Sequence, residues 1–217
     1  DTINDYNNLG YCERIAATNP CGEQPLPPYG ACLLGSFNLV KYLQEKDNGW
    51  EFNYELFKHD IPIVVRAMDN VVDRTIYPLE KQKEEAESKR RMGLGITGLA
   101  NAAEMCGYPY ASQEFLDFTE EVLATLRDCS YAASSDLALE KGSFPLFDAM
   151  HYMQSKFIQT LPDWVKTKIQ NQGIRNSHLT SIAPTGTISL VADNVSSGIE
   201  PPFMLYYDRS IEQFDGI

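Results

Sequence analysis

The sequence predicts an α/β fold, in which short strands rich in glycine alternate with long amphipathic helices. Residues 92–98 alternate large apolar side chains with glycine, which is typical of a buried strand that another backbone approaches closely. Residues 60–77 and 112–142 each place apolar side chains at the i, i+3, i+4 and i+7 positions of a helix. One buried strand between two long helices indicates a layered domain.

In chain order, residues 35–43 are apolar over too short a stretch to distinguish a strand from a short helix. The first long helix is expected from Asp60 to the residue before Pro78, and Pro62 is tolerated because it falls in the first turn. Residues 80–91 are charged on all sides, which favours a solvated helix or linker over a binding role.

The strand at 92–98 leads into a helix expected at 99–105. We attribute its glycines to close packing, and not to a phosphate loop, because no lysine follows as in a Walker motif. The second long helix is expected from an N-cap at Ser112 to a C-terminal cap at Gly142. Shorter helices are expected at 148–159 and 163–172.

Composition excludes several classes of function. The chain has 217 residues, and its 18 Lys and Arg against 30 Asp and Glu give a net charge of −12, which argues against a nucleic-acid-binding surface. No apolar run reaches the roughly 18 residues of a membrane span and no signal peptide is visible, so a cytoplasmic location is expected. Five cysteines without CxxC spacing and three histidines indicate neither a disulfide framework nor a metal site.

The most informative stretch is residues 19–32. Its prolines deny the chain a helix, and extended chain would place the side chains of Asn19, Cys21 and Glu23 on one face, with Gly22 leaving the other face free. A conventional thiolate nucleophile needs a nearby base, and no histidine is close in sequence. A carboxylate two residues away would raise the thiol pKa, which suits hydrogen-atom chemistry of a neutral thiol.

A second informative stretch is residues 176–191. Residues 179–183 alternate like a strand that Pro184 ends, and residues 185–187 form a tight turn into a segment that can be helical. Free backbone N–H groups, hydroxyls and the positive end of a helix dipole then converge, so the turn can hold a phosphate without Lys or Arg. A plain N-cap is the alternative interpretation.

The remaining candidate side chains are interpreted as structural. A redox role is the alternative for the cysteines, of which Cys129 lies on the apolar stripe of the second long helix. No neighbouring pattern makes either of two histidines a ligand or a base. These residues are Cys12, Cys106, Cys129, His151 and His178.

The pattern Asn-x-Cys-x-Glu at 19–23 resembles the finger loop of the ribonucleotide reductase large (catalytic) subunit. Residues 32–39, 183–189 and 196–203 resemble the adenosylcobalamin-dependent class II enzymes of that family. The resemblance implies a ten-stranded α/β barrel of two five-stranded halves. This chain would be a partial catalytic barrel domain over 1–217, the second half, with the finger near its N-terminus.

The resemblance implies thiyl-radical reduction of ribonucleotides to deoxyribonucleotides. Cys21 would take the 3′ hydrogen, Glu23 would accept the 3′-hydroxyl proton, and Asn19 would hold ribose hydroxyls. Cys32 would be one of two reducing thiols, and its family partner lies upstream of the finger, where no residue of this chain can be assigned. The substrate contacts that it implies are Asn19, Pro20, Cys21, Gly22, Glu23, Pro184, Thr185, Gly186, Thr187, Ile188 and Ser189.

The same resemblance implies adenosylcobalamin as radical generator, a thioredoxin-type reductant, a di- or triphosphate substrate, and the rest of a longer reductase chain as partner. Self-association is possible through an open barrel edge. Three alternatives remain open: a class I enzyme that depends on a radical subunit, a non-catalytic split module that complements another chain, and a nucleotide-binding protein that uses only residues 184–189.

Overall fold

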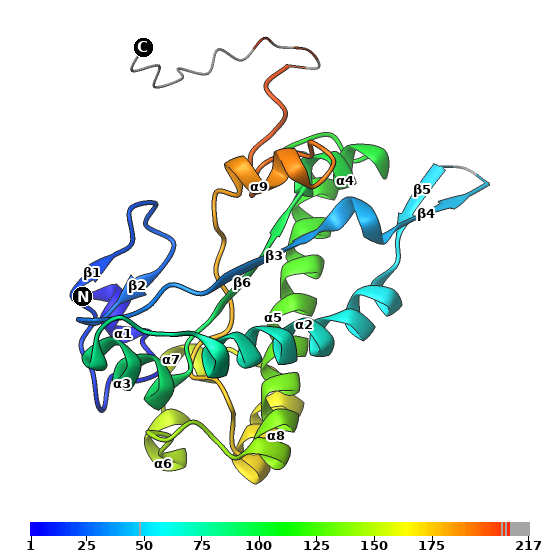
Figure 1. Cartoon of the computed structure of the whole chain (residues 1–217). Coiled ribbons are helices and arrows are strands. Elements are labelled where there is room, and N and C mark those ends of the chain that lie inside the picture. Colours follow the sequence, from blue (N-terminus) through cyan, green and yellow to red (C-terminus); the bar gives the residue numbers. More distant parts are fainter. Residues whose placement is uncertain (48, 205, 207, 209–217) are drawn as a thin grey trace, which may run out of the picture.

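The computed structural model describes residues 1–47, 49–204, 206 and 208, and Figure 1 shows their arrangement. The elements are α1 (Thr2–Asp5), β1 (Ala17–Thr18), β2 (Pro25–Leu26), β3 (Leu34–Asn38), the 3-10 turn η1 (Leu39–Tyr42), β4 (Leu43–Lys46), β5 (Gly49–Phe52), α2 (Tyr54–Arg74), α3 (Glu80–Lys89), β6 (Gly93–Thr97), α4 (Leu99–Met105), α5 (Gln113–Lys141), α6 (Ala149–Tyr152), α7 (Lys156–Gln159), α8 (Asp163–Gln172) and α9 (Gly186–Val191). Mixed helix and strand content confirms the expected α/β class.

The centre of the fold is the parallel pair β3–β6. All five residues of β6 are buried, which confirms the strand expected at 92–98. On its other side, Leu94 forms an isolated parallel bridge with Thr180. The strand expected at 179–183 is reduced to this single bridge, because within the described chain no further strand pairs with its outer edge. The parallel core therefore consists of β3, β6 and the Thr180 segment.

Two glycines of β6 permit a close approach of neighbouring chain. A Cβ atom at Gly93 would collide with the side-chain amide of Gln24, and one at Gly95 would collide with the carbonyl oxygen of Ser181. These contacts confirm that the glycines serve packing, and they place segments 19–26 and 180–185 directly against β6.

The long helices α2 and α5 pack against each other beside the strands, and α8 packs against α5 (Figure 1). The predicted bounds of α5 are confirmed at both ends. The hydroxyl of Ser112 accepts a 3.2 Å hydrogen bond from the Phe115 N–H, and Gly142 ends the helix with a φ of 83°.

The predicted start of α2 is wrong. The helix begins at Tyr54, with Asn53 as its N-cap, six residues before the expected Asp60. Phe57 is fully buried and extends the apolar stripe by one more turn. Pro62 therefore lies inside the helix, on its exposed side, and not in the first turn.

The charged run 80–91 is only partly as expected. It forms α3, but Lys89, Arg90 and Arg91 at its end are 6%, 4% and 8% exposed. Buried cations require paired anions, which come from distant segments that periodicity does not reveal. A solvated linker is therefore the wrong description of this end.

Two further expectations change in detail. Residues 35–43 form β3 followed by the turn η1. The helix expected at 148–159 is divided into α6 and α7, and at the division Ser155 donates a 2.9 Å hydrogen bond to Oδ1 of Asn8. Among the residues that the structure describes, no helix combines the length and apolar character that crossing a bilayer requires.

Candidate active site

Residues 19–24 form the turn of a β-hairpin whose strands are β1 and β2. The N–H of Asn19 donates to the carbonyl of Gln24 at 3.2 Å, and the N–H of Gln24 donates to Oδ1 of Asn19 at 2.9 Å. Gly22 has a φ of 86° and donates to the Asn19 carbonyl. The extended run with one shared face is therefore wrong, because asparagine and glycine favour a tight turn here.

The turn presents Cys21 to solvent and leaves Glu23 partly buried. Oε2 of Glu23 is buried and has no hydrogen-bond partner in the described part of the chain. The Glu23 carbonyl accepts a 2.7 Å hydrogen bond from the hydroxyl of Ser181. A buried acceptor without a hydrogen-bond donor costs free energy. We therefore expect Oε2 to accept a hydrogen bond from a group outside the described residues.

Cys32 lies within electrostatic reach of the hairpin turn. Burial raises the pKa of its thiol, and charges on Glu23 and Cys21 raise that pKa further. The charges of Glu23 and Cys21 therefore both act on the Cys32 thiol. Cys32 also borders a cavity of about 250 Å³ that Glu85 and Arg91 help to line.

The expected phosphate loop is a helix N-terminus. Thr185, at a φ of 53°, precedes α9, which confirms that the segment after the turn is helical. No described residue accepts a hydrogen bond from the N–H groups of Gly186, Thr187 or Ile188, whereas Ser189 N–H donates to the Thr185 carbonyl. Three free N–H groups and the exposed Thr187 hydroxyl therefore face outward.

Two hydroxyls of this loop have structural roles. The Gly198 N–H donates to Oγ1 of Thr185 at 2.6 Å, and Thr185 also contacts the Thr97 hydroxyl at 3.0 Å. The Ser189 hydroxyl donates to the Gly186 carbonyl at 3.0 Å. The hydroxyls of Thr185 and Ser189 therefore hold the loop in shape.

The hairpin and the α9 loop share one support. Ser181, which holds the Glu23 carbonyl, lies four residues before Thr185 and packs over Gly95 of β6. A cavity of about 440 Å³ lies beside α9 and is lined by Gly186, Ser189 and residues 194–197, among others. Ser181 thus connects the hairpin that carries Cys21 and Glu23 to the segment that leads into α9.

Residues 1–216 match the family described as ribonucleotide reductase, barrel domain. The chain belongs to this reductase family. It is 38% identical over 97% of its length to the vitamin B12-dependent ribonucleoside-diphosphate reductase of Mycobacterium tuberculosis, of which it covers 28%. It is 37% identical to the protein of the same name from Thermoplasma acidophilum, again over 97% of its length and 25% of the relative.

More distant reductases match as well. A ribonucleoside-diphosphate reductase subunit alpha from Chlamydia pneumoniae is 29% identical over 97% of this chain and 22% of its own length. The chain thus spans about a quarter of the curated reductases that it matches. Residues 19–32 and 183–189 lie within the region that matches the family.

The buried cations at the end of α3 were missed by the sequence analysis. Glu13 pairs with Nζ of Lys89 at 2.8 Å and with the Arg91 guanidinium at 2.6 Å, and its side chain is 2% exposed. Burial alone would raise the pKa of Glu13, but Arg91 and Lys89 outweigh it and hold that pKa below its usual value. The only sequence signal was an acidic residue upstream of a basic triplet, which is too common to be decisive.

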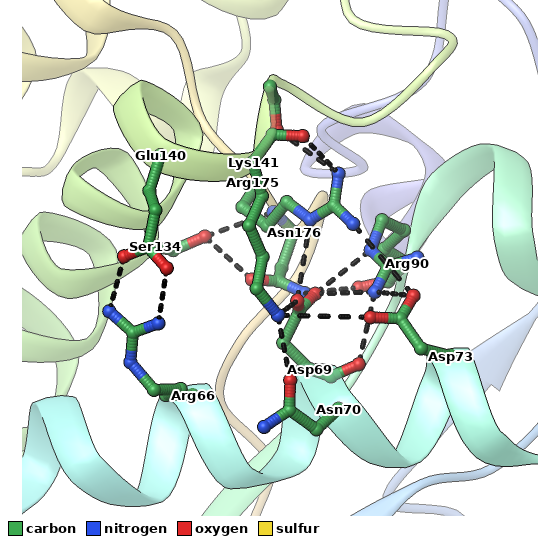
Figure 2. A network of polar contacts seen from close by, with 11 residues as sticks. Arg66, Asp69, Asn70, Asp73, Arg90, Ser134, Glu140, Lys141, Arg175 and Asn176 are labelled. Carbon is green, nitrogen blue, oxygen red and sulfur yellow. Dashed lines mark hydrogen bonds and ion pairs between the residues drawn. The ribbon is translucent and has the colours of Figure 1, made fainter.

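Asp69 is the centre of a second buried network, shown in Figure 2. It is fully buried, and its carboxylate pairs with Arg90 at 2.8 Å and accepts a 3.0 Å hydrogen bond from Nδ2 of Asn176. Lys141 and Arg175 each lie 3.3 Å away. Burial favours a raised pKa for Asp69, but Arg90 and the other donors reverse that and lower it.

His178 lies between the two networks and is structural in this geometry, as expected. Its Nε2 contacts Oδ1 of Asn7 at 3.1 Å and its Nδ1 contacts the Ser177 hydroxyl at 3.0 Å. Burial, followed by the charges of Arg91 and Lys89, holds the pKa of His178 well below its usual value. The ring is therefore a neutral donor to Asn7.

This neutral histidine predicts a pH dependence of stability. Because its folded pKa is depressed, the unfolded chain binds the proton first, and stability is lost as pH falls below the unfolded value of about 6.5. We expect His178 alone to lower the free energy of unfolding by about 1.4 kcal/mol between pH 7.5 and 5.5. Urea unfolding at both pH values measures this loss of unfolding free energy. A His178→Gln variant that loses the same amount between these pH values would contradict the assignment of the loss to His178.

Proposed function

We propose that this chain is the catalytic barrel segment of a reductase that converts ribonucleoside diphosphates to 2′-deoxyribonucleoside diphosphates for DNA synthesis. The observation that carries the proposal is the buried, unpartnered Oε2 of Glu23 in the same turn as the exposed Cys21 thiol. The names of the vitamin B12-dependent ribonucleoside-diphosphate reductases support the substrate class. The parallel core would be part of the ten-stranded barrel, with residues 19–32 as its finger.

In this proposal a ribonucleotide lies between the hairpin and α9. The free N–H groups of Gly186, Thr187 and Ile188 bind the terminal phosphate oxygens, helped by the positive end of the helix dipole. Asn19 faces the ribose with its amide nitrogen, because its Oδ1 is held by the turn. Pro20, Gly22 and Pro184 shape the backbone around the substrate.

Cys21 and Glu23 carry the chemistry at C3′. Once the Cys21 thiol has lost a hydrogen atom, its thiyl sulfur takes the hydrogen from C3′. Oε2 of Glu23 accepts the proton of the 3′-hydroxyl, which is the donor that this buried atom lacks. The 2′-hydroxyl leaves as water once a reducing thiol has given it a proton, and Cys21 later returns a hydrogen atom to C3′.

Cys32 supplies one of the two thiols that are oxidised to a disulfide as the ribose is reduced. Its raised pKa keeps the thiol protonated near neutral pH, so it can deliver both a proton and an electron. Its disulfide partner and the thioredoxin-type reductant that restores both thiols are contributed by other parts of the assembly. Reduction therefore requires the remainder of a reductase, so the chain is expected to be inactive alone.

Adenosylcobalamin fits this chain because the Cys21 thiol, which it would have to reach, is exposed. Bound beside the hairpin, it would supply the radical that removes the hydrogen atom of Cys21, whose exposure leaves the sulfur open to such a group. The relatives named vitamin B12-dependent support this cofactor over a radical subunit. No described residue is assigned to hold the corrin.

The other readings are weaker. A radical-subunit enzyme is favoured only by more distant relatives such as the chlamydial alpha subunit. Two other readings leave the unpartnered Oε2 of Glu23 unexplained. These are a split, non-catalytic module and a protein that binds nucleotides through residues 184–189 alone. A cytoplasmic location and self-association of the open barrel remain predictions.

The test is deoxynucleotide formation by a complete reductase that carries residues 1–217, with adenosylcobalamin and the thioredoxin system. We expect turnover that depends on cobalamin. The turnover rate of a Cys32→Ser variant should be lower by at least about 100-fold, since one of two reducing thiols is gone. Cys106→Ser is the matched control and should retain turnover. Activity only with a partner radical subunit would move the protein to class I, and none under either condition would contradict the proposal.

A further inference from the structure

Three consecutive cations, Lys89, Arg90 and Arg91, are buried immediately before β6, and their side chains divide between two networks. Lys89 and Arg91 bind Glu13. Arg90 binds Asp69 from the opposite side. Lys89 ends α3 and Arg90 caps it in the left-handed conformation, at a φ of 52°, so the side chains part at a helix C-terminus and not in extended chain.

The first network holds the segment that enters the hairpin. Glu13 lies between α1 and β1, six residues before Asn19, and both of its carboxylate oxygens are within 2.8 Å of Arg91 Nη2. Its side chain is 2% exposed, so these charge-assisted hydrogen bonds are shielded from solvent. The entrance to the turn that carries Cys21 is therefore fixed to Arg91 and, through it, to β6.

The second network holds the segment that enters the α9 loop. Nδ2 of Asn176 donates both to Asp69 and, at 3.1 Å, to the Arg90 carbonyl, while its Oδ1 accepts from the Ser134 hydroxyl at 2.8 Å (Figure 2). One residue on, the Ser177 N–H donates to the Lys89 carbonyl at 3.1 Å. The chain that continues to Ser181 and α9 is thus fixed to the same three residues.

We propose that Lys89, Arg90 and Arg91 are positioning residues that set the separation between the Cys21 hairpin and the N-terminus of α9. The proposal rests on the proposed function, since a ribonucleotide must reach from one loop to the other. Neither loop contacts the triplet itself. Each depends on it through a buried anion or amide a few residues upstream.

The separation matters because the thiyl sulfur must reach C3′ while the phosphate is held. A displacement of about 1 Å at a reacting centre costs on the order of 100-fold in rate. Each loop alone still binds its own part of the nucleotide, so a loosened triplet should lower kcat more than affinity. That split distinguishes positioning from simple loss of the folded state.

The first experiment measures amide hydrogen exchange in the complete reductase that carries this chain. Arg91→Lys and Arg90→Lys keep the charge but remove the forked hydrogen bonding. We expect Arg91→Lys to raise exchange about tenfold at the hairpin amide of Asn19, and Arg90→Lys to do so at the α9 amide of Ser189, because each variant loses one charge-assisted hydrogen bond of the network that holds that loop. Arg66→Lys, in the exposed pair with Glu140, is the matched control and should change neither.

The second experiment measures kcat and the nucleotide Kd of the same variants at a temperature where all are folded. We expect kcat to fall by roughly 10- to 100-fold in Arg91→Lys and Arg90→Lys, with Kd changed less than about threefold. If Arg90→Lys fails to fold, Glu13→Gln tests the first network, which holds the segment that enters the hairpin. Exchange unchanged in the loop that each arginine holds, or kcat unchanged, would overturn the positioning role, whereas a wild-type enzyme without turnover would contradict the proposed function.

Discussion

A Cys21→Ala variant of the complete reductase is expected to lose turnover by at least about 1,000-fold while its nucleotide affinity stays nearly intact. The methyl group has no S–H bond and so cannot form a thiyl radical. Affinity should survive because, in the proposed function, the backbone of α9 binds the phosphate, and because Cys21 is exposed. Deoxynucleotide formation and equilibrium nucleotide binding measure the two quantities.

The control for this substitution is Cys129→Ala. Cys129 lies on α5, away from the hairpin, and burial is the first cause of its raised thiol pKa. It should retain full turnover. Residual turnover in Cys21→Ala at a substantial fraction of the wild-type rate would show that the hydrogen atom is taken by another group, and the radical assignment would be wrong.

Local sequence signals predicted the parts of the fold that local physics decides. The long helix α5 was predicted to the residue because Ser112 and Gly142 are strong caps at its two ends. Strand β6 was predicted because glycines between large apolar residues have few other uses. In both cases the deciding interactions are within a few residues of one another.

Tertiary contacts decided the features that were missed. The buried state of Arg90 and Arg91 depends on Asp69 and Glu13, which are far away in sequence. The division of residues 148–159 into two helices coincides with a hydrogen bond from Ser155 to Asn8. Periodicity within one segment contains no information about such partners.

The geometry of the candidate site was not predicted. The Asn-x-Cys-x-Glu pattern nominated the reacting groups, which stay a prediction, but a φ of 86° at Gly22 and the Asn19 side chain fold the stretch into a turn. The turn separates an exposed thiol from a buried carboxylate oxygen, which an extended run would have placed side by side. Similarly, the hydroxyl of Thr185 is engaged with Gly198, 13 residues further along.

The second large effect is expected at Asp69. We predict that Asp69→Ala lowers the free energy of unfolding by about 3–5 kcal/mol, because removing one partner of a buried ion pair leaves the other charge uncompensated. Asp69 is fully buried, and Arg90 beside it has a side chain only 5% exposed. The loss is a large fraction of the stability of an ordinary domain, so the variant should unfold at markedly lower urea concentration.

The pH dependence of this effect identifies its cause. Because the folded pKa of Asp69 is lowered, its contribution is present above the unfolded value of about 3.9 and is lost as pH falls through the folded pKa. The difference between wild type and Asp69→Ala should therefore shrink in acid and stay constant between pH 5 and 7. Glu140→Gln, which breaks the exposed pair with Arg66 in the same view (Figure 2), should leave urea unfolding nearly unchanged. An Asp69→Ala variant as stable as Glu140→Gln would mean that the buried cations find other anions or water. In that case the Asp69 network would not join α2 to the segment that enters α9.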